Sequence, residues 1–314
     1  MSLQNELKII KNLPEFKDLR EEMTLADKKK LRKIYVQKND YIAIVGYKIL
    51  KDFARFTSHE DLSNDKIDYA GKSRIYLTGL KRRGVYRRAS EAILRQYNEQ
   101  YNCATPDHQC MDCYNCFTYG GVIAVKGETQ AIKSRLKAIT AFSIQSDEEA
   151  SIDEEEFHNI VHNDFRMEQA EQGQQKKASI YNLLLIKPGV VFPFIDIIFN
   201  PTKFDLAMYL EMLRRADALG FGSRSSLLGT METKMIAITD NMKVSHKDLL
   251  TKITINETGD VIYEELTKQL SKDEIVDDNQ LEKVRSLLPE LIKKYSNKIY
   301  GSAISENSTA KKLR

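Results

Sequence analysis

Short apolar runs rich in β-branched residues recur along the chain and predict buried strands. One of them, residues 41–50, reads YIAIVGYKIL and suits a strand that is covered on both faces. Another, at 178–199, contains the turn signal Pro188-Gly189. Further strands are predicted at 74–80, 120–127, 136–144 and 234–239.

Helical patterns alternate with these runs. Residues 87–100 have the Ala, Leu, Glu and Gln content of a helix. Thr202 can cap an amphipathic helix that Gly220 ends. The first 35 residues and the chain beyond residue 240 contain more helical and polar segments. Because strands and helices are interspersed, the predicted class is α+β with insertions.

Two polar segments interrupt the pattern. Residues 57–74 predict a long surface loop, with Gly71 inside it. Residues 145–179 turn acidic and then rich in Gln and Lys, so we expect an inserted hairpin or a partly disordered loop.

Composition narrows the class of protein. The chain has 314 residues, 42% of them hydrophobic and 30% charged, enough apolar content for a core. No apolar run approaches the roughly 20 residues of a membrane-spanning helix, and the N-terminus does not read as a secretory signal. We therefore expect a cytoplasmic protein with no membrane partner. The net charge of +3 hides a basic block at 72–95 and an acidic block at 147–156.

The strongest chemical pattern is C-x6-C-x2-C-x2-C, formed by all four cysteines: Cys103, Cys110, Cys113 and Cys116. Thiolates from one short loop can converge on tetrahedral Zn²⁺, and His108 can replace one of them. The C-x2-C-x2-C half is also typical of iron–sulfur ligands, and free or disulfide-bonded cysteines are a third interpretation. We predict a closed, structural zinc site that holds together a loop with little apolar content.

The basic block is densest at Lys81 to Arg88, which contains Lys81, Arg82, Arg83, Arg87 and Arg88. Gly79 and Gly84 allow close approach of a backbone, and Tyr86 is available for stacking. These features predict contact with the phosphates of a nucleic acid. A solvated helix face is the alternative.

A glycine- and serine-rich loop, Gly220 to Gly229, reads GFGSRSSLLG. Its backbone amides, the Ser223 hydroxyl and the Arg224 guanidinium can bind phosphate. It lacks the Lys-Ser/Thr ending of a nucleotide-binding P-loop, so an ATPase is not indicated. A plain helix-ending loop is the alternative.

Two other candidate metal sites are weaker. His158 and His162, preceded by Glu154 to Glu156, have the i, i+4 spacing of a helical metal site, although a solvated helix face is the simpler interpretation. Asp61, Asp65 and Asp68 can bind Mg²⁺, although turn residues of this kind are common.

The order of these segments resembles the backbone subunit of type I-D CRISPR effector complexes, a member of the repeat-associated RNA-binding superfamily. The resemblance runs from about Tyr41 to Thr239. It is most specific in KSRLKAITAFSI, residues 133–144, and in GFGSRSSLLG. The cysteine pattern is consistent with the zinc-binding insertion of that family.

The resemblance implies a modified RRM-like (ferredoxin-like) core with insertions. The core would comprise 36–56, 118–144 and 180–240. A zinc-binding insertion with the basic block would occupy 57–117, an acidic thumb-like insertion 145–179, and a helical C-terminal region 241–314. No aromatic RRM motif is present, so base stacking on the sheet is not expected.

The resemblance also implies a function without catalysis. Copies of the chain would stack along one CRISPR RNA, together with other subunits of the complex, and would present the guide for pairing with target DNA. The cations near residue 85 and around residue 224 would then form one track. The implied RNA-binding residues are Lys72, Arg74, Lys81, Arg82, Arg83, Arg87, Arg88, Lys133, Ser134, Arg135, Ser223 and Arg224.

Two alternatives from other classes stay open. One is a metal-dependent single-strand nuclease on the same fold, with Asp61, Asp65 and Asp68 as ligands of Mg²⁺. The other is an unrelated zinc-binding nucleic-acid adaptor.

Overall fold

A four-stranded antiparallel sheet lies at the centre of the computed structural model, which describes residues 12–16, 23–25, 33–35, 40–58, 63–125, 128–159, 178–223, 225 and 228–304. The sheet has the order β13-β3-β12-β8, and every neighbouring pair is antiparallel. Its strands are β3 (Tyr41–Leu50), β8 (Leu136–Ala138), β12 (Val191–Phe199) and β13 (Met231–Thr239). The apolar run at 41–50 is thus a central strand, as predicted.

Two long helices connect these strands. α2 (Gly79–Tyr97) follows β3, and α5 (Lys203–Leu219) joins β12 to β13. The chain order along the sheet is therefore β-α-β-β-α-β. As predicted, Thr202 caps α5, forming a capping box with Asp205, and Gly220 ends it with a φ of 78°.

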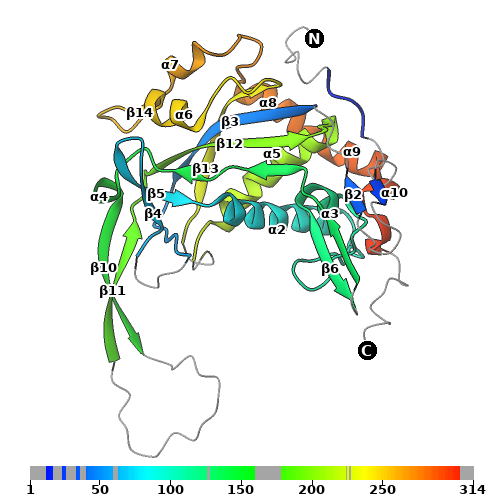
Figure 1. Cartoon of the computed structure of the whole chain (residues 1–314), viewed down its shortest axis with the longest axis horizontal. Helices are drawn as coiled ribbons and strands as arrows, with labels where there is room; N and C mark the ends of the chain where they lie inside the picture. The colour runs from blue at the N-terminus through cyan, green and yellow to red at the C-terminus, as the bar shows by residue number, and fades with distance from the viewer. Residues whose placement is uncertain are drawn as a thin grey trace, which may run out of the picture.

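The sheet is covered on both faces. Alternate residues of its central strands point to opposite sides, and those on each side belong to a different apolar cluster. Ile42 and Phe194 belong to the apolar cluster under α2 and α5. Val45 and Ile195 belong to a second cluster, which the C-terminal region covers with Leu249 and other apolar residues. Figure 1 shows α2 below the sheet and the C-terminal helices α6 (His246–Lys252) and α7 (Glu264–Thr267) above it.

α2 belongs to this layered core. It packs against β8 and α5, and its buried residues Arg87 and Glu91 face the cysteine segment. The predicted boundaries between core and insertions stay a prediction. One expectation is corrected: the range 57–117 was expected outside the core, yet it contains α2, which packs in the core. The sequence pattern indicated only the later part of this helix, at 87–100, because its first ten residues carry two glycines and five cations.

A hairpin replaces most of the loop that was predicted at 57–74. β4 (Lys66–Tyr69) pairs with β5 (Lys72–Leu77), and β9 (Ala141–Phe142) adds a third strand. The turn residues Ala70 and Gly71 both have positive φ, 51° and 79°, which suits a two-residue hairpin turn. The long-loop prediction is therefore wrong for this segment. Residues 59–62 lie outside the described part.

The acidic insertion begins with α4 (Asp147–Ala150) and continues as β10 (Ser151–Asn159), which pairs with β11 (Ala178–Ile186). Figure 1 shows this hairpin extending away from the sheet. The hairpin interpretation is confirmed for these strands, and 160–177 lie outside the described residues. His158 lies on a strand, so the helical interpretation is wrong for His158, and His162 lies outside the described residues.

The cysteine segment contains α3 (Tyr114–Tyr119), followed by β6 (Gly121–Val125) and β7 (Glu128–Ile132). In the N-terminal part, β1 (Met23–Leu25) and β2 (Lys33–Tyr35) pair as a hairpin, where helix and polar connection were expected.

The C-terminal region is largely helical, as predicted. α8 (Asp278–Ser286), α9 (Leu288–Lys294), α10 (Ser296–Ile299) and a 3₁₀ turn (Gly301–Ile304) follow α7. α8 and α9 pack on α5. A two-stranded ribbon, β14 (Thr254–Ile255) and β15 (Val261–Ile262), was not predicted. Among the helices described here, none combines the length and apolarity needed to cross a membrane.

Candidate metal centre and nucleic-acid interface

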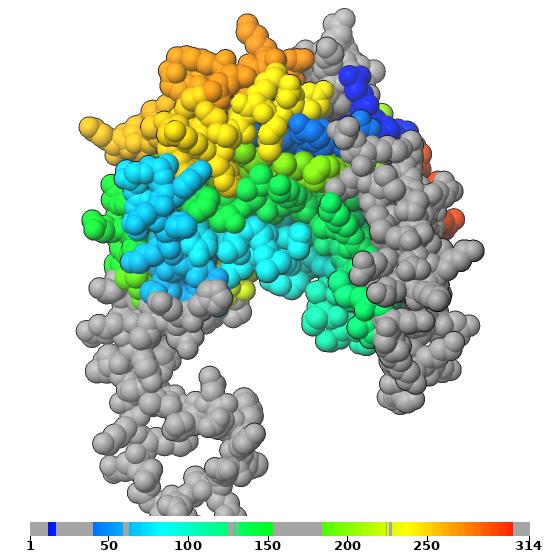
Figure 2. All heavy atoms as spheres, viewed as in Figure 1, coloured from blue at the N-terminus to red at the C-terminus, as the bar shows by residue number. Residues whose placement is uncertain are grey.

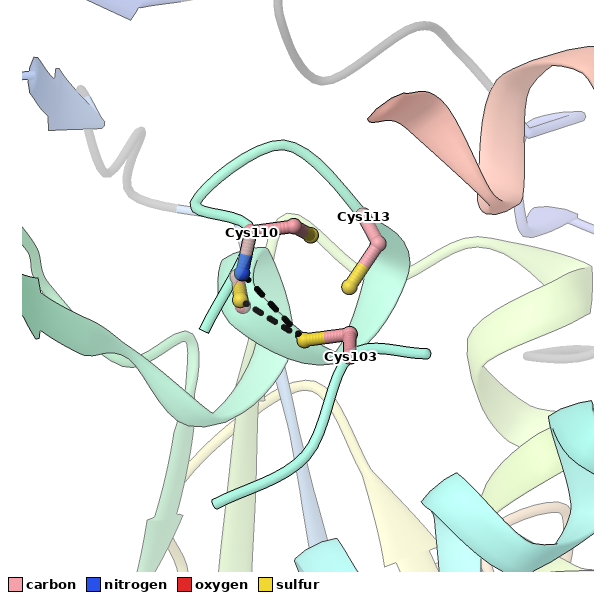
Figure 3. A group of neighbouring side chains, drawn as sticks. Cys103, Cys110 and Cys113 are labelled. Atoms are coloured by element: carbon pink, nitrogen blue, oxygen red, sulfur yellow. Dashed lines mark hydrogen bonds between the residues drawn. The ribbon is translucent and has the colours of Figure 1, made fainter. Parts of the chain in front are cut away.

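The four cysteines converge on one point. Their Sγ atoms all lie within 4.8 Å of one another, and the Sγ atoms of Cys103 and Cys116 are 3.6 Å apart. Figure 3 shows Cys103, Cys110 and Cys113 pointing toward one another from the loop and the start of α3. Cys110 is half-buried and the other three are buried. The cluster can hold a metal ion.

The geometry suits one tetrahedral ion bound by sulfur. With Zn–S bonds of about 2.3 Å, the sulfur atoms of a tetrahedral site are about 3.8 Å apart. Cys113 precedes α3 and Cys116 lies in its first turn, and an i, i+3 spacing puts both side chains on one side of the helix. The group consists of cysteines, and His108 is exposed outside it. Substitution of a cysteine ligand by His108 is therefore not supported.

The thiols do not ionise alike. Hydrogen bonds from the Cys110, Cys113 and Cys116 thiols lower the pKa of Cys103. Burial raises the pKa of Cys113 well above its usual value. A cation at the centre of the cluster favours the ionised form of all four thiols.

Two arginines that were expected to contact RNA are buried. Arg82 is fully buried, and its Nη2 donates to both carboxylate oxygens of Asp196 at 2.8 Å. Arg135 is also fully buried and donates to the two oxygens of Asp205 at 3.1 and 2.6 Å. The prediction that these two arginines bind RNA is wrong, because a buried guanidinium paired with a carboxylate has no accessible charge for a phosphate.

Tyr86 is likewise part of the core. It is fully buried, and its hydroxyl accepts a hydrogen bond from Arg82 Nη2 at 2.8 Å. Burial raises the pKa of Tyr86 well above its usual value. The expectation that Tyr86 stacks on a base is therefore wrong.

Arg74 and Arg87 are also buried. Arg74 donates to the backbone oxygens of Tyr69 and Ser143, at 2.9 and 2.6 Å. Arg87 faces the cysteine cluster and donates to Glu91 and to Gly120 O. The prediction that Arg74 and Arg87 bind RNA is therefore wrong, since each guanidinium is hydrogen-bonded to groups of the protein.

The accessible cations lie on the other side of α2. Arg88 is exposed and Arg83 is half-buried, and within the described part of the chain they form no ion pair. Leu80, Gly84 and Arg88 follow one another at i, i+4 spacing, so they lie on one outward stripe of the helix. Leu80 is 72% exposed.

The remaining predicted contacts have mixed surroundings. Lys81 donates to Asp65 at 3.0 Å, and Lys72 lies 3.7 Å from Glu149. Lys133 is exposed, while the Ser134 hydroxyl donates to backbone oxygens.

The glycine-rich loop lies beside α2. The Phe221 ring is 6.1 Å from the Tyr86 ring, and Ser223 N donates to Arg55 O at 2.9 Å. At Gly222 a Cβ atom would approach Arg55 O to 2.3 Å, so the close approach requires glycine. Phe221 and Tyr86 are therefore neighbours in the core, and whether cations near 85 and 224 form one track stays a prediction. Arg224 lies outside the described residues.

The carboxylates proposed for Mg²⁺ do not form a cluster where they are described. Asp65 accepts hydrogen bonds from Ser58 N and from Lys81 Nζ, and Asp68 lies on the exposed strand β4. Asp61 lies outside the described residues. Over the described ranges, the group of metal-ligating side chains is the four cysteines.

Sequence reasoning missed the link between α2 and the cysteines. Arg87 and Glu91 form an i, i+4 ion pair at 3.0 Å, and Arg87 Nη2 donates to Cys116 Sγ at 3.7 Å. The i, i+4 spacing of the opposite charges Arg87 and Glu91 could have indicated their ion pair from the sequence.

Comparison with known proteins places this fold. The crystal structure of Thermofilum pendens Csc2 matches 90% of this chain and 92% of its own, with a TM-score of 0.59 and 17% identity. A chain of a CRISPR RNA-guided surveillance complex in a pre-nicking state matches 79% of this chain and 89% of its own, with a TM-score of 0.43 and 10% identity. No curated protein matches.

The family model described as Csc2 Crispr matches residues 34–312. This range includes the central sheet, both long helices and the cysteine cluster. The chain therefore belongs to the Csc2 CRISPR family.

Proposed function

We propose that this chain is a non-catalytic backbone subunit of a type I-D CRISPR complex that binds the sugar–phosphate chain of a CRISPR RNA. Copies of it would line up along the guide with other subunits of the complex and present the guide for pairing with target DNA. Membership of the Csc2 family supports this proposal. So does the β-α-β-β-α-β order with sheet order β13-β3-β12-β8, which is that of a ferredoxin-like, RRM-like core.

The observation that carries the proposal is the outward stripe of α2. Arg83 and Arg88 flank Gly84, which leaves the helix backbone open between two cations. Figure 2 shows that the molecule is hollowed on its lower side, below α2 and beside β6. The glycine-rich loop meets the same helix on its core side, where Phe221 packs against Tyr86. A concave basic surface with a bare backbone suits a phosphate chain.

The covered sheet explains why phosphates and not bases would be bound. An RRM stacks bases on aromatic side chains of its open sheet face. Here that face is closed by the cluster around Val45, Ile195 and Leu249. Contact through cations carries no sequence information, which leaves the choice of target to base pairing.

We infer that the cysteine site holds Zn²⁺ in a structural role. Four sulfur atoms within 4.8 Å of one another leave room for a single ion, whereas an iron–sulfur cluster would separate thiolates that bind different irons. Cys103, Cys110, Cys113 and Cys116 would hold the ion, which supplies charge to a closed site. The thiolates would keep the loop before α3 in place.

Charge reversal on α2 tests the RNA proposal. The variant Arg83→Glu/Arg88→Glu should strongly weaken binding of single-stranded RNA with little change in thermal stability, because Arg88 is exposed and Arg83 is only half-buried. The control Lys247→Glu/Lys268→Glu makes the same charge change at exposed positions on the opposite side of the sheet.

The readout is RNA affinity at several salt concentrations. Each lost phosphate contact should reduce the slope of log K against log salt by about 0.7 for a single strand. We expect a reduced slope for the α2 variant and an unchanged slope for the control. Equal losses in both variants would show that net charge, and not this surface, binds RNA.

A further inference from the structure

Arg87 is buried between α2 and the cysteine cluster. Its Nη2 donates to Cys116 Sγ at 3.7 Å, its Nη1 to Gly120 O at 2.6 Å, and its Nε to Glu91 at 3.0 Å. The side chain is 9% exposed. One guanidinium thus connects a cysteine, the residue after α3 and the next turn of α2.

A second chain of hydrogen bonds reaches the cluster from the same helix. The Ser90 hydroxyl donates to Asn115 Oδ1 at 2.5 Å, and Asn115 Nδ2 donates to the Tyr101 hydroxyl at 3.1 Å. That hydroxyl lies 3.2 Å from Cys113 Sγ. Two of the four cysteines are therefore held from α2.

These contacts can stabilise the negative charge that a metal-loaded cysteine site would carry. Four thiolates around a divalent ion carry a net charge of about −2 in a buried place. A guanidinium that donates to one sulfur offsets part of that charge and orients the thiolate. Groups that orient metal ligands in this way typically change metal affinity by about 10- to 100-fold when they are removed.

We propose that Arg87 is a positioning residue of the metal site, which holds Cys116 for the ion and balances the charge of the thiolates. This proposal rests on the metal site proposed above. It assigns different roles to two adjacent arginines. Arg87 points inward to the metal site, and Arg88 points outward to the RNA surface.

The test compares variants of the full-length protein loaded with Zn²⁺ or Co²⁺. The variant Arg87→Gln/Glu91→Gln removes both members of the ion pair, so that neither Arg87 nor Glu91 is left buried and charged without the other. Arg88→Gln is the matched control one residue away. Zn²⁺ affinity is measured by competition with a chelator, and the thiolate-to-Co²⁺ charge-transfer band reports on the sulfur ligands.

We expect the Arg87→Gln/Glu91→Gln variant to lose roughly 10- to 100-fold in Zn²⁺ affinity and to shift the Co²⁺ band. Arg88→Gln should keep the Zn²⁺ affinity and the Co²⁺ band. A variant that is merely less stable would leave the band of the folded, loaded protein unchanged. Circular dichroism checks that each variant is folded.

The outcomes separate this inference from the proposed function. If the wild-type protein binds Co²⁺ without a tetrahedral sulfur spectrum, the metal site itself is wrong. If the wild type shows that spectrum and the Arg87→Gln/Glu91→Gln variant keeps both band and affinity, only the role of Arg87 is wrong. RNA binding enters neither comparison.

Discussion

Replacing Gly84 by Ala should strengthen the fold and weaken RNA binding at once. Among the described residues outside the backbone of α2 itself, a Cβ at residue 84 would meet Arg88 Nη1, at 3.7 Å, an ordinary contact. Glycine in a helix interior costs about 0.5–1 kcal/mol relative to alanine. Gly84→Ala should therefore raise the free energy of unfolding by about that amount, because the site has room for a methyl group.

RNA binding should change in the opposite direction. If the phosphate chain lies on the bare backbone between Arg83 and Arg88, the added methyl group holds it away. The loss of one charge-assisted contact is worth about 1.5 kcal/mol, which corresponds to a roughly tenfold weaker affinity. Urea unfolding measures the stability, and fluorescence anisotropy with a labelled single-stranded RNA measures the affinity.

Gly79→Ala is the matched control in the same basic block. There a Cβ would lie 1.9 Å from Ala138 O, so the helix must shift away from β8. We expect a loss of about 1–3 kcal/mol in stability, the usual cost of overpacking. If Gly84→Ala gains stability and binds RNA as tightly as the wild type, RNA does not approach α2 at this position. A loss of stability in Gly84→Ala would contradict the structural argument itself.

Three further predictions concern the core, the cysteines and acid. Arg82→Met should lower the free energy of unfolding, measured in urea, by about 3–5 kcal/mol, because it leaves Asp196 buried and charged. The double variant Arg82→Met/Asp196→Leu should recover most of that loss. Equal losses in the two variants would contradict the ion-pair argument. Cys113→Ala should release Zn²⁺ and lower the melting temperature, and metal loss without a change in melting would show that the site is not structural. Hydrogen bonds from Ser245 and Lys252 lower the pKa of Asp248 from 3.8 to about 2. Its contribution to stability is thus complete above its unfolded pKa and is lost as pH falls toward 2, so the difference in unfolding free energy between wild type and Asp248→Asn should shrink from pH 4 to pH 2. A difference that is constant over that range would refute the assignment.

The sequence predicted those features that depend on neighbours along the chain. The central strand at 41–50, the capped helix after Thr202 and the convergence of the cysteines all follow from local spacing. Each rests on a local periodicity or on a short loop, which the sequence shows directly.

The roles of the individual arginines could not be predicted in the same way. Arg82 is neutralised by Asp196, 114 residues away, and Arg135 by Asp205, 70 residues away. The composition of the basic block does not distinguish Arg82 from Arg88. Only the tertiary structure shows that Arg82 forms an ion pair with a carboxylate. A helical periodicity applied to the basic block would have separated them, since the two residues lie on different sides of α2.

Cross-linking of the protein to its bound RNA by ultraviolet light, followed by mass spectrometry, tests the central claim most directly. The account predicts cross-linked peptides from the first turns of α2, around Arg83 and Arg88, and from the loop between Gly220 and Gly229. Cross-links confined to α6 and α7, on the opposite side of the sheet, would contradict it.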